Sequence, residues 1–266
     1  MKIETGFAQV NGSQLYYETA GTGHPLVLLH GMALDTRMWD AQFEVFAQYY
    51  RVIRLDFRGF GRSPIKRGDT VHHFEDLHSL LTHLEIEQTH VIGLSLGGSI
   101  AIDFTLTHSA FVSKLVLVDS GCGGWEWSDE MKSIFAISQM ARTENLLAAK
   151  KAWLECSLFQ PAQEHAAVAK QLTQIVADYQ GLHWLHDDIT MEGPTPPAFE
   201  RLNEIKAPTL IVVGERDVRD FHEIAAMIER EIPDAQSITL SDVGHMSNME
   251  DSQGFNATVL KFLQDK

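Results

Sequence analysis

The segment that most constrains the fold is residues 91–100, which read V-I-G-L-S-L-G-G-S-I. A short apolar strand is predicted at its start, followed by a G-x-S-x-G turn and the beginning of an amphipathic helix. This arrangement holds a serine on a strained strand-to-helix turn and exposes its hydroxyl above a parallel sheet. Side chains two positions before or after Ser95 would clash with the adjoining strand or helix, so Gly93 and Gly97 provide the clearance. We therefore predict a strand, a sharp turn carrying Ser95, and a helix.

Composition places the chain among ordinary globular proteins. Its 266 residues can bury one sizeable core, and 44% of them are hydrophobic while 21% are charged. A net charge of -15 argues against binding to nucleic acid or to an anionic membrane, because both need a basic surface. We see no signal peptide and no apolar stretch of transmembrane length. Cys122 and Cys156 are too few for a disulfide framework, so we expect free thiols and a cytoplasmic protein.

Outside residues 121–198, the chain alternates predicted strands with predicted helices. Asn11-Gly12 between two β-rich runs predicts an antiparallel hairpin near the start. Further strands are predicted at 26–29, 51–56, 91–94, 114–119, 209–213 and 236–240. Helices are predicted at 38–48, 73–84 and 221–230, directly after Ser95, and at the end of the chain. This order predicts an α/β fold with a mostly parallel central sheet of about eight strands, the first pair antiparallel, and helices on both faces.

Residues 121–198 interrupt this alternation. They contain no convincing strand, and helices are predicted at 129–142, 144–157 and 163–179, between a glycine-rich and a proline-rich hinge. Ser128 is well placed to cap the first of these helices. We expect a helical lid, residues 121–198, inserted after the sixth strand of a core domain made of residues 1–120 and 199–266. Of its many aromatic side chains, we expect a few to face a pocket.

Three residues form the candidate catalytic set. A serine hydroxyl is a poor nucleophile until a base takes its proton, and a carboxylate must orient that base. In the strand–turn–helix arrangement above, the partners follow in the chain order serine, acid, histidine. Asp217 lies four residues after the strand that ends at Val213, and His245 lies in the loop after the last strand. Ser95, Asp217 and His245 are therefore expected at one edge of the sheet, where open α/β sheets bind ligands.

Other residues compete for these roles. Asp220 could be the acid, but its position at the start of a predicted helix suits an N-cap better. Asp119 also ends a strand and stays open as a rival acid. His30 is interpreted as a structural brace of the loop that follows the strand at 26–29, rather than as an acid or base.

The oxyanion formed by such a serine needs two fixed N–H donors. Leu96 offers the first, because its N–H lies at the start of the helix after Ser95, where N–H groups have no partner within the helix. The loop after the strand at 26–29 should offer the second. We expect it from the backbone of Met32, since Gly31 allows close approach of that loop.

Taken together, these stretches resemble the α/β-hydrolase fold superfamily, in its group of small, lid-bearing, esterase-like enzymes. The motifs that carry the resemblance are L-L-H-G-M at 28–32, D-F-R-G-F-G-R-S at 56–63, G-L-S-L-G-G at 93–98, G-E-R-D at 214–217 and G-H at 244–245. They span nearly the whole chain outside the lid and keep the family's order. The resemblance implies the fold and the set of Ser95, Asp217 and His245. It also implies a structural loop at 56–63, in which Arg58 is expected to tie the lid side to the core.

The resemblance fixes the substrate less closely. The expected activity is hydrolysis of a small to medium, hydrophobic carboxylic ester through an acyl-enzyme. Ser95 in place of aspartate disfavours haloalkane dehalogenation, and residues 32–39 lack the polar Ser-Asn pair usual in hydrolases of carbon–carbon bonds. Lactone or carbon–carbon hydrolysis, acyl transfer, peracid formation, a slow-turnover small-molecule receptor and an inactive binding module stay open. With no H-E-x-x-H or Cys-x-x-Cys motif, we predict no catalytic metal, and we expect no cofactor.

Overall fold

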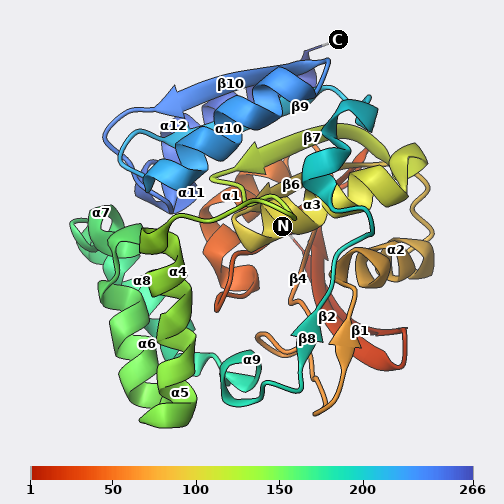
Figure 1. Cartoon of the computed structure of the whole chain (residues 1–266). Coiled ribbons are helices and arrows are strands. Elements are labelled where there is room, and N and C mark those ends of the chain that lie inside the picture. Colours follow the sequence, from red (N-terminus) through yellow and green to blue (C-terminus); the bar gives the residue numbers. More distant parts are fainter. Residues whose placement is uncertain (1, 266) are drawn as a thin grey trace.

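The computed structural model describes residues 2–265, which form an eight-stranded sheet surrounded by helices (Figure 1). The order across the sheet is β1-β2-β4-β3-β6-β7-β9-β10. β2 pairs antiparallel with β1 and β4, and the other neighbours are parallel, as predicted. The strands are β1 (Ile3–Val10), β2 (Ser13–Ala20), β3 (Pro25–Leu29), β4 (Arg51–Leu55), β6 (Thr89–Leu94), β7 (Val112–Val118), β9 (Thr209–Gly214) and β10 (Ala235–Leu240).

Helices cover the sheet because its central strands are apolar on both faces. Every residue of β6 and β9 is buried, as expected of a parallel sheet packed between two layers. The covering helices are α1 (Asp40–Phe46), α2 (His73–His83), α3 (Leu96–Thr107), α10 (Arg219–Glu231), α11 (Ser247–Glu250) and α12 (Ser252–Gln264). Among them, α1 contacts α12, whereas α2 contacts α3. None of the helices within residues 2–265 is long and apolar enough to cross a membrane.

The chain between β7 and β9 is mainly helical, and the green helices of residues 129–178 lie to one side of the sheet (Figure 1). Ser128 caps the first helix by accepting a hydrogen bond from the N–H of Met131, as predicted. The helix predicted at 129–142 is divided by a 3₁₀ turn at Ile137–Gln139. The helices are α4 (Asp129–Ala136), α5 (Met140–Thr143), α6 (Leu146–Glu155), α7 (Gln160–Gln163), α8 (Ala166–Asp178) and α9 (Leu182–Leu185).

One strand in this region was not predicted. β8 (Thr190–Met191) pairs with β5 (Thr70–Val71), which lies between β4 and α2, in a separate two-stranded sheet. Two residues are too few to show an alternating pattern in the sequence, so no signal marked either strand. The pairing joins the end of the helical segment to the core, and the division into a core and a lid at 121–198 stays a prediction.

The loop at 56–63 makes the connection expected of Arg58 through two different groups. The Arg58 guanidinium pairs with Asp76 of α2 at 2.5 Å, and only 8% and 3% of these two side chains are exposed. Asp76 also accepts a hydrogen bond from the side chain of Asn11 in the β1–β2 turn. The carbonyl of Arg58 accepts a hydrogen bond from Nε2 of His183 in α9 at 3.0 Å. The side chain therefore anchors the core, and the backbone holds the helical segment.

This buried ion pair gives a stability prediction. Asp76→Ala should lower the free energy of unfolding by about 3–5 kcal/mol, because it leaves the Arg58 charge buried without its partner. Glu223→Ala is the control, since Glu223 pairs with Arg219 on the exposed surface of α10 and its loss should cost under about 0.5 kcal/mol. Urea unfolding followed by circular dichroism measures both. Equal losses in the two variants would contradict the structural role of Asp76.

Candidate active site

Ser95 lies at a strained turn between β6 and α3. Its φ of 57° and ψ of -112° place a residue other than glycine in a region that side chains disfavour. A Cβ on Gly93 would overlap the backbone of Gly97, and one on Gly97 would overlap the carbonyl of Leu29 in the neighbouring strand β3. The two glycines therefore allow the close approach that the sequence predicted.

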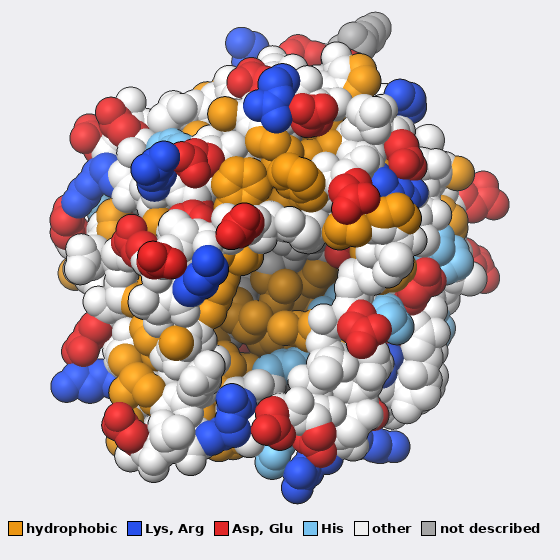
Figure 2. All heavy atoms as spheres, in the orientation of Figure 1, with side chains coloured by type: hydrophobic (Ala, Val, Ile, Leu, Met, Phe, Trp, Pro, Cys, Tyr) orange, Lys and Arg blue, Asp and Glu red, His pale blue; other side chains and the backbone are white. Residues whose placement is uncertain are grey.

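Ser95 and His245 line one cavity of about 160 Å³. Among the residues described, its walls carry no charged carboxylate, lysine or arginine side chain, and Ser99 adds the only other hydroxyl. Figure 2 shows a hollow between the helical segment and the core, with hydrophobic side chains on its floor. The apolar walls are formed by Met32, Leu34, Leu94, Leu96, Trp127, Met131, Phe135, Trp153, Leu158, Phe159, Phe221 and Met246.

His245 and Asp217 are paired beside this cavity. His245 Nδ1 lies 2.9 Å from Asp217 Oδ2, and both side chains are almost fully buried. The other oxygen of Asp217 accepts the N–H of Val218 at 2.7 Å, which fixes the carboxylate in place. Both residues lie in loops after neighbouring parallel strands, β9 and β10. The ring of Phe221, from α10, packs against the imidazole with ring centres 4.3 Å apart.

The environment of His245 suits a proton acceptor. Burial lowers the pKa of its ring below the ordinary value of 6.5, and nearby carboxylates oppose the shift. The ring is therefore neutral near pH 7. A neutral imidazole that donates from Nδ1 to Asp217 leaves Nε2 as an acceptor.

Asp119, the rival acid, lies behind this pair rather than on the histidine. It is buried, and its two oxygens accept the N–H of Gly214 at 2.8 Å and the hydroxyl of Ser247 at 2.6 Å. Burial and the charge of the neighbouring Asp217 raise the pKa of Asp119 well above 3.8.

Burial raises the pKa of Asp217 as well, and the N–H of Val218 and the contact with Asp119 oppose that shift. Two adjacent buried carboxyls do not both ionise, so the pair holds one proton. We assign this proton to Asp119, because Asp217 is the carboxylate that accepts from His245 Nδ1 and from the N–H of Val218.

Asp220 is not the N-cap that the sequence suggested. The helix α10 starts earlier than predicted, at Arg219, so its N-cap is Val218. Asp220 instead accepts hydrogen bonds from the N–H and hydroxyl of Ser128, at 2.9 and 2.5 Å, and from the indole of Trp125. It joins α10 to the start of the helical segment and makes no contact that would make it the partner of the histidine.

Met32 and Leu96, the residues predicted to supply the oxyanion donors, both line this cavity. Leu96 begins α3, and Met32 lies in the turn after β3, where the N–H of Leu34 donates to the carbonyl of Gly31 at 3.3 Å. Ala33 in this turn has a φ of 59°, which shows how tightly the loop is folded. Within residues 2–265, the backbone N–H groups of Met32 and Leu96 donate to no protein acceptor.

His30 braces this loop, as predicted. Its Nδ1 bonds the carbonyl of Gly31 at 2.8 Å, and its Nε2 accepts the N–H of Phe57 at 3.0 Å. Burial lowers the pKa of His30 to about 4, which keeps the ring neutral. The loop carrying Met32 is therefore tied to the loop after β4.

A model of the alpha/beta hydrolase family matches residues 26–258. With the strained serine turn, the sheet order and the paired histidine and aspartate now described, the chain belongs to this family.

Individual relatives differ in what they act on. The chain is 26% identical over 271 residues to a pimeloyl-(acyl-carrier protein) methyl ester esterase of Nitrosospira multiformis, covering 93% of this chain and 97% of the relative. It is 29% identical over 268 residues to a 2-hydroxy-6-oxononadienedioate/2-hydroxy-6-oxononatrienedioate hydrolase of Paraburkholderia phymatum, covering 94% and 91%. The solved enol-lactonase of Burkholderia xenovorans is 23% identical, has a TM-score of 0.82 and covers 98% of this chain and 100% of its own, which supports the fold.

The sequence predicted Ser95 and His245 in the cavity, but it predicted few of the residues that form the apolar walls. Trp127, Trp153 and Phe159 were among the lid aromatics of which a few were expected to face a pocket, and they do. Phe221 and Met246 were missed as wall residues. No local signal marks them, because a helix or loop residue shows the direction of its side chain only once the elements are packed.

Two isosteric substitutions distinguish the roles of the two buried carboxyl groups, Asp217 and Asp119. Asp217→Asn should lower kcat for a p-nitrophenyl ester by about 10⁴-fold, because an amide that donates to Nδ1 holds the wrong tautomer of His245. Asp119→Asn should keep kcat within about tenfold, because its amide can donate toward Asp217 as a protonated carboxyl does. Steady-state kinetics on both variants measure the difference. A larger loss in Asp119→Asn than in Asp217→Asn would make Asp119 the acid.

Proposed function

We propose that this protein is a serine hydrolase that cleaves a small to medium, hydrophobic carboxylic ester through an acyl-enzyme. One observation carries the proposal: Ser95 and His245 line one cavity with apolar walls, and His245 is paired with the buried Asp217. Ser95 and His245 supply a nucleophile and a base, and the cavity supplies a place for an uncharged acyl group. The helical segment at 121–198 is proposed as the lid of that cavity.

The proposed reaction runs in two halves. Ser95 Oγ attacks the ester carbonyl while His245 Nε2 takes its proton, and Asp217 holds the imidazole in the required tautomer. The oxyanion accepts hydrogen bonds from the N–H groups of Leu96 and Met32. The protonated His245 then gives its proton to the leaving alcohol. Water attacks the acyl-enzyme by the same route in reverse and releases the acid.

The walls of the cavity define the substrate class. A cavity of about 160 Å³ is close in size to one of about 150 Å³ that admits benzene, so an acyl group of roughly four to six carbons fits. Burying a charged group there without a partner would cost several kcal/mol. The name of the dienedioate hydrolase implies a dicarboxylate substrate, for which this cavity offers no cationic side chain. A neutral ester or lactone therefore fits better than such a dianion.

The state of the two cysteine thiols indicates the cellular compartment of the protein. Cys122 and Cys156 are both free, and Cys122 is buried. Free cysteines are typical of proteins in a reducing compartment, so we propose a cytoplasmic location. The proposed partner is a small molecule, and a net charge of -15 gives no support to nucleic acid as a partner.

A series of p-nitrophenyl esters tests the reaction and the size of the acyl group. We expect kcat/KM to be highest for acyl chains of about four to six carbons. It should fall for chains of about ten carbons or more, because these are longer than the cavity can hold. Ser95→Ala should reduce kcat by about 10⁶-fold, since the nucleophile is lost. Ser99→Ala is the matched control in the same cavity and should keep kcat within about tenfold. Hydrolysis that survives in Ser95→Ala would overturn the proposal.

The same assay extends to the alternatives. Neutral lactones and carbon–carbon substrates belong in the panel, and preference for one of them by the wild type would replace the ester with that class. Ser95-dependent product formed only once per enzyme molecule, as in a burst without steady turnover, would favour a receptor over an enzyme.

The pH dependence of kcat/KM has a defined sign. Only the neutral ring of His245 accepts the proton of Ser95, so the rate falls as the pH drops through the pKa of that ring. Because burial lowers this pKa, the acid limb should have its midpoint below pH 6.5. Stopped-flow or steady-state rates across the acid range measure it, with preincubation at each pH to exclude unfolding. A midpoint above pH 7 would contradict the buried, neutral histidine.

A further inference from the structure

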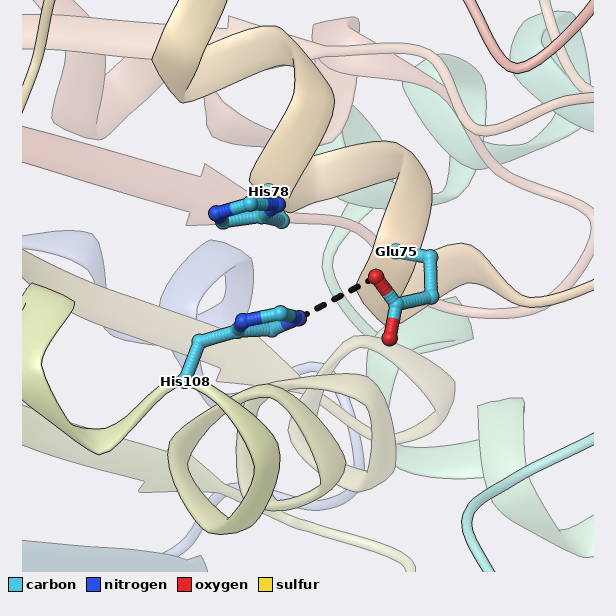
Figure 3. Close-up of side chains that lie close together, drawn as sticks. All are labelled: Glu75, His78 and His108. Atoms are coloured by element: carbon cyan, nitrogen blue, oxygen red, sulfur yellow. Dashed lines mark hydrogen bonds and ion pairs between the residues drawn. The ribbon is translucent and has the colours of Figure 1, made fainter.

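A second group of side chains suited to ion binding lies outside the active site. Glu75 and His78 lie one turn apart on α2, and His108 follows the last residue of α3. Figure 3 shows the two imidazole rings one above the other, with Glu75 beside His108. One ligand atom from each residue lies within 4.8 Å of the other two, and all three residues are half-buried.

Two of these atoms already have the spacing of metal ligands. Glu75 Oε2 lies 3.2 Å from His108 Nε2. Two ligands at about 2.0–2.2 Å from a tetrahedral metal are roughly 3.3–3.5 Å apart. A cation can therefore replace the proton between them with little movement, and the ring proton of His108 then lies on Nδ1.

His78 supplies the third ligand after a rotation. The rings of His78 and His108 are stacked, with centres 4.1 Å apart and planes only 1° apart. Lone pairs in parallel planes do not converge, so the His78 ring must turn for its nitrogen to reach a shared ion. No hydrogen bond within residues 2–265 holds the His78 side chain, whereas Phe111 packs edge-on against its ring at 4.9 Å. The aromatic contacts that this rotation changes, among the described residues, are the stacking on His108 and the edge-on contact with Phe111.

The charge of the cluster also favours a cation. Glu75 forms its ion pair with His108 and with no lysine or arginine of the described residues. A carboxylate with two neutral imidazoles has a net charge of -1, in a chain whose net charge is -15. Calcium and magnesium prefer sites made of oxygen ligands, whereas imidazole with carboxylate suits zinc and its transition-metal neighbours.

We propose that Glu75, His78 and His108 bind one divalent transition-metal ion, with zinc as the representative, and water completing its coordination. The site joins α2 to the end of α3. The helix α3 has 12 residues, so its end lies about 18 Å along the axis from the turn that carries Ser95. The bound ion therefore stabilises the packing of α2 on α3 and takes no part in the reaction at Ser95.

Zinc titration of the full-length, chelator-treated protein tests this site. Calorimetry on the wild type should give one zinc ion per chain, and His78→Ala, His108→Ala and Glu75→Gln should each weaken binding at least about tenfold. His83→Ala is the matched control, because His83 is an exposed histidine at the end of the same helix, and it should bind as the wild type does. Cobalt gives a second readout, since a visible absorption band of the wild-type complex should be lost in His78→Ala and His108→Ala.

Thermal unfolding supplies the functional consequence. Zinc should raise the Tm of the wild type and of His83→Ala in a concentration-dependent way, because it binds the folded state, and should leave the Tm of His78→Ala and His108→Ala unchanged. Circular dichroism confirms that the variants are folded. Absence of saturable zinc binding below millimolar concentration would overturn the site. So would zinc binding that is as strong in His78→Ala and His108→Ala as in the wild type.

Discussion

The crowded backbone around Ser95 is the constraint on which the site depends. The strand β6 must reverse into α3 within one residue, and this residue is held at a positive φ. Such a turn is possible because Gly93 and Gly97 have no side chains. A Cβ on Gly93 would overlap the backbone of Gly97, and a Cβ on Gly97 would overlap the carbonyl of Leu29. The cost of the strain is met by the surrounding sheet, whose strands β3 and β6 are buried and paired in register. The serine is therefore positioned by the packing of the backbone together with its backbone hydrogen bonds. Its N–H donates to the carbonyl of Val118 at 3.0 Å, and its carbonyl accepts the N–H groups of Ser99 and Gly121 at 3.1 and 3.2 Å.

The parallel sheet then collects the remaining groups. Asp217 and His245 are far from Ser95 in sequence, yet the loops that carry them follow β9 and β10, and carboxyl ends of parallel strands lie at one edge. Behind them, Asp119 accepts hydrogen bonds from the N–H of Gly214, the last residue of β9, and from the hydroxyl of Ser247. A protonated Asp119 thus supports the charged Asp217 without competing for the histidine.

Local sequence signals explain which parts of the fold and of the candidate site could be predicted. Ser95, Asp217 and His245 each follow a recognisable apolar run, so strand ends and chain order were enough to propose them together. The pairing of β5 with β8 was missed because two residues carry no period. The role of Asp220 was also missed, because its partner Ser128 is distant in sequence and only packing brings them together. The walls of the cavity depend on the same three-dimensional information.

The most direct measurement is covalent labelling with a serine-directed alkyl phosphonate, located by peptide mass spectrometry. The proposed arrangement predicts a single phosphonyl group on Ser95, formed in step with loss of ester hydrolysis, and no label in Ser95→Ala. It also predicts much slower labelling of Asp217→Asn, in which His245 no longer activates the hydroxyl. A label on another residue, or inhibition without modification of Ser95, would contradict the assignment of Ser95 as the nucleophile.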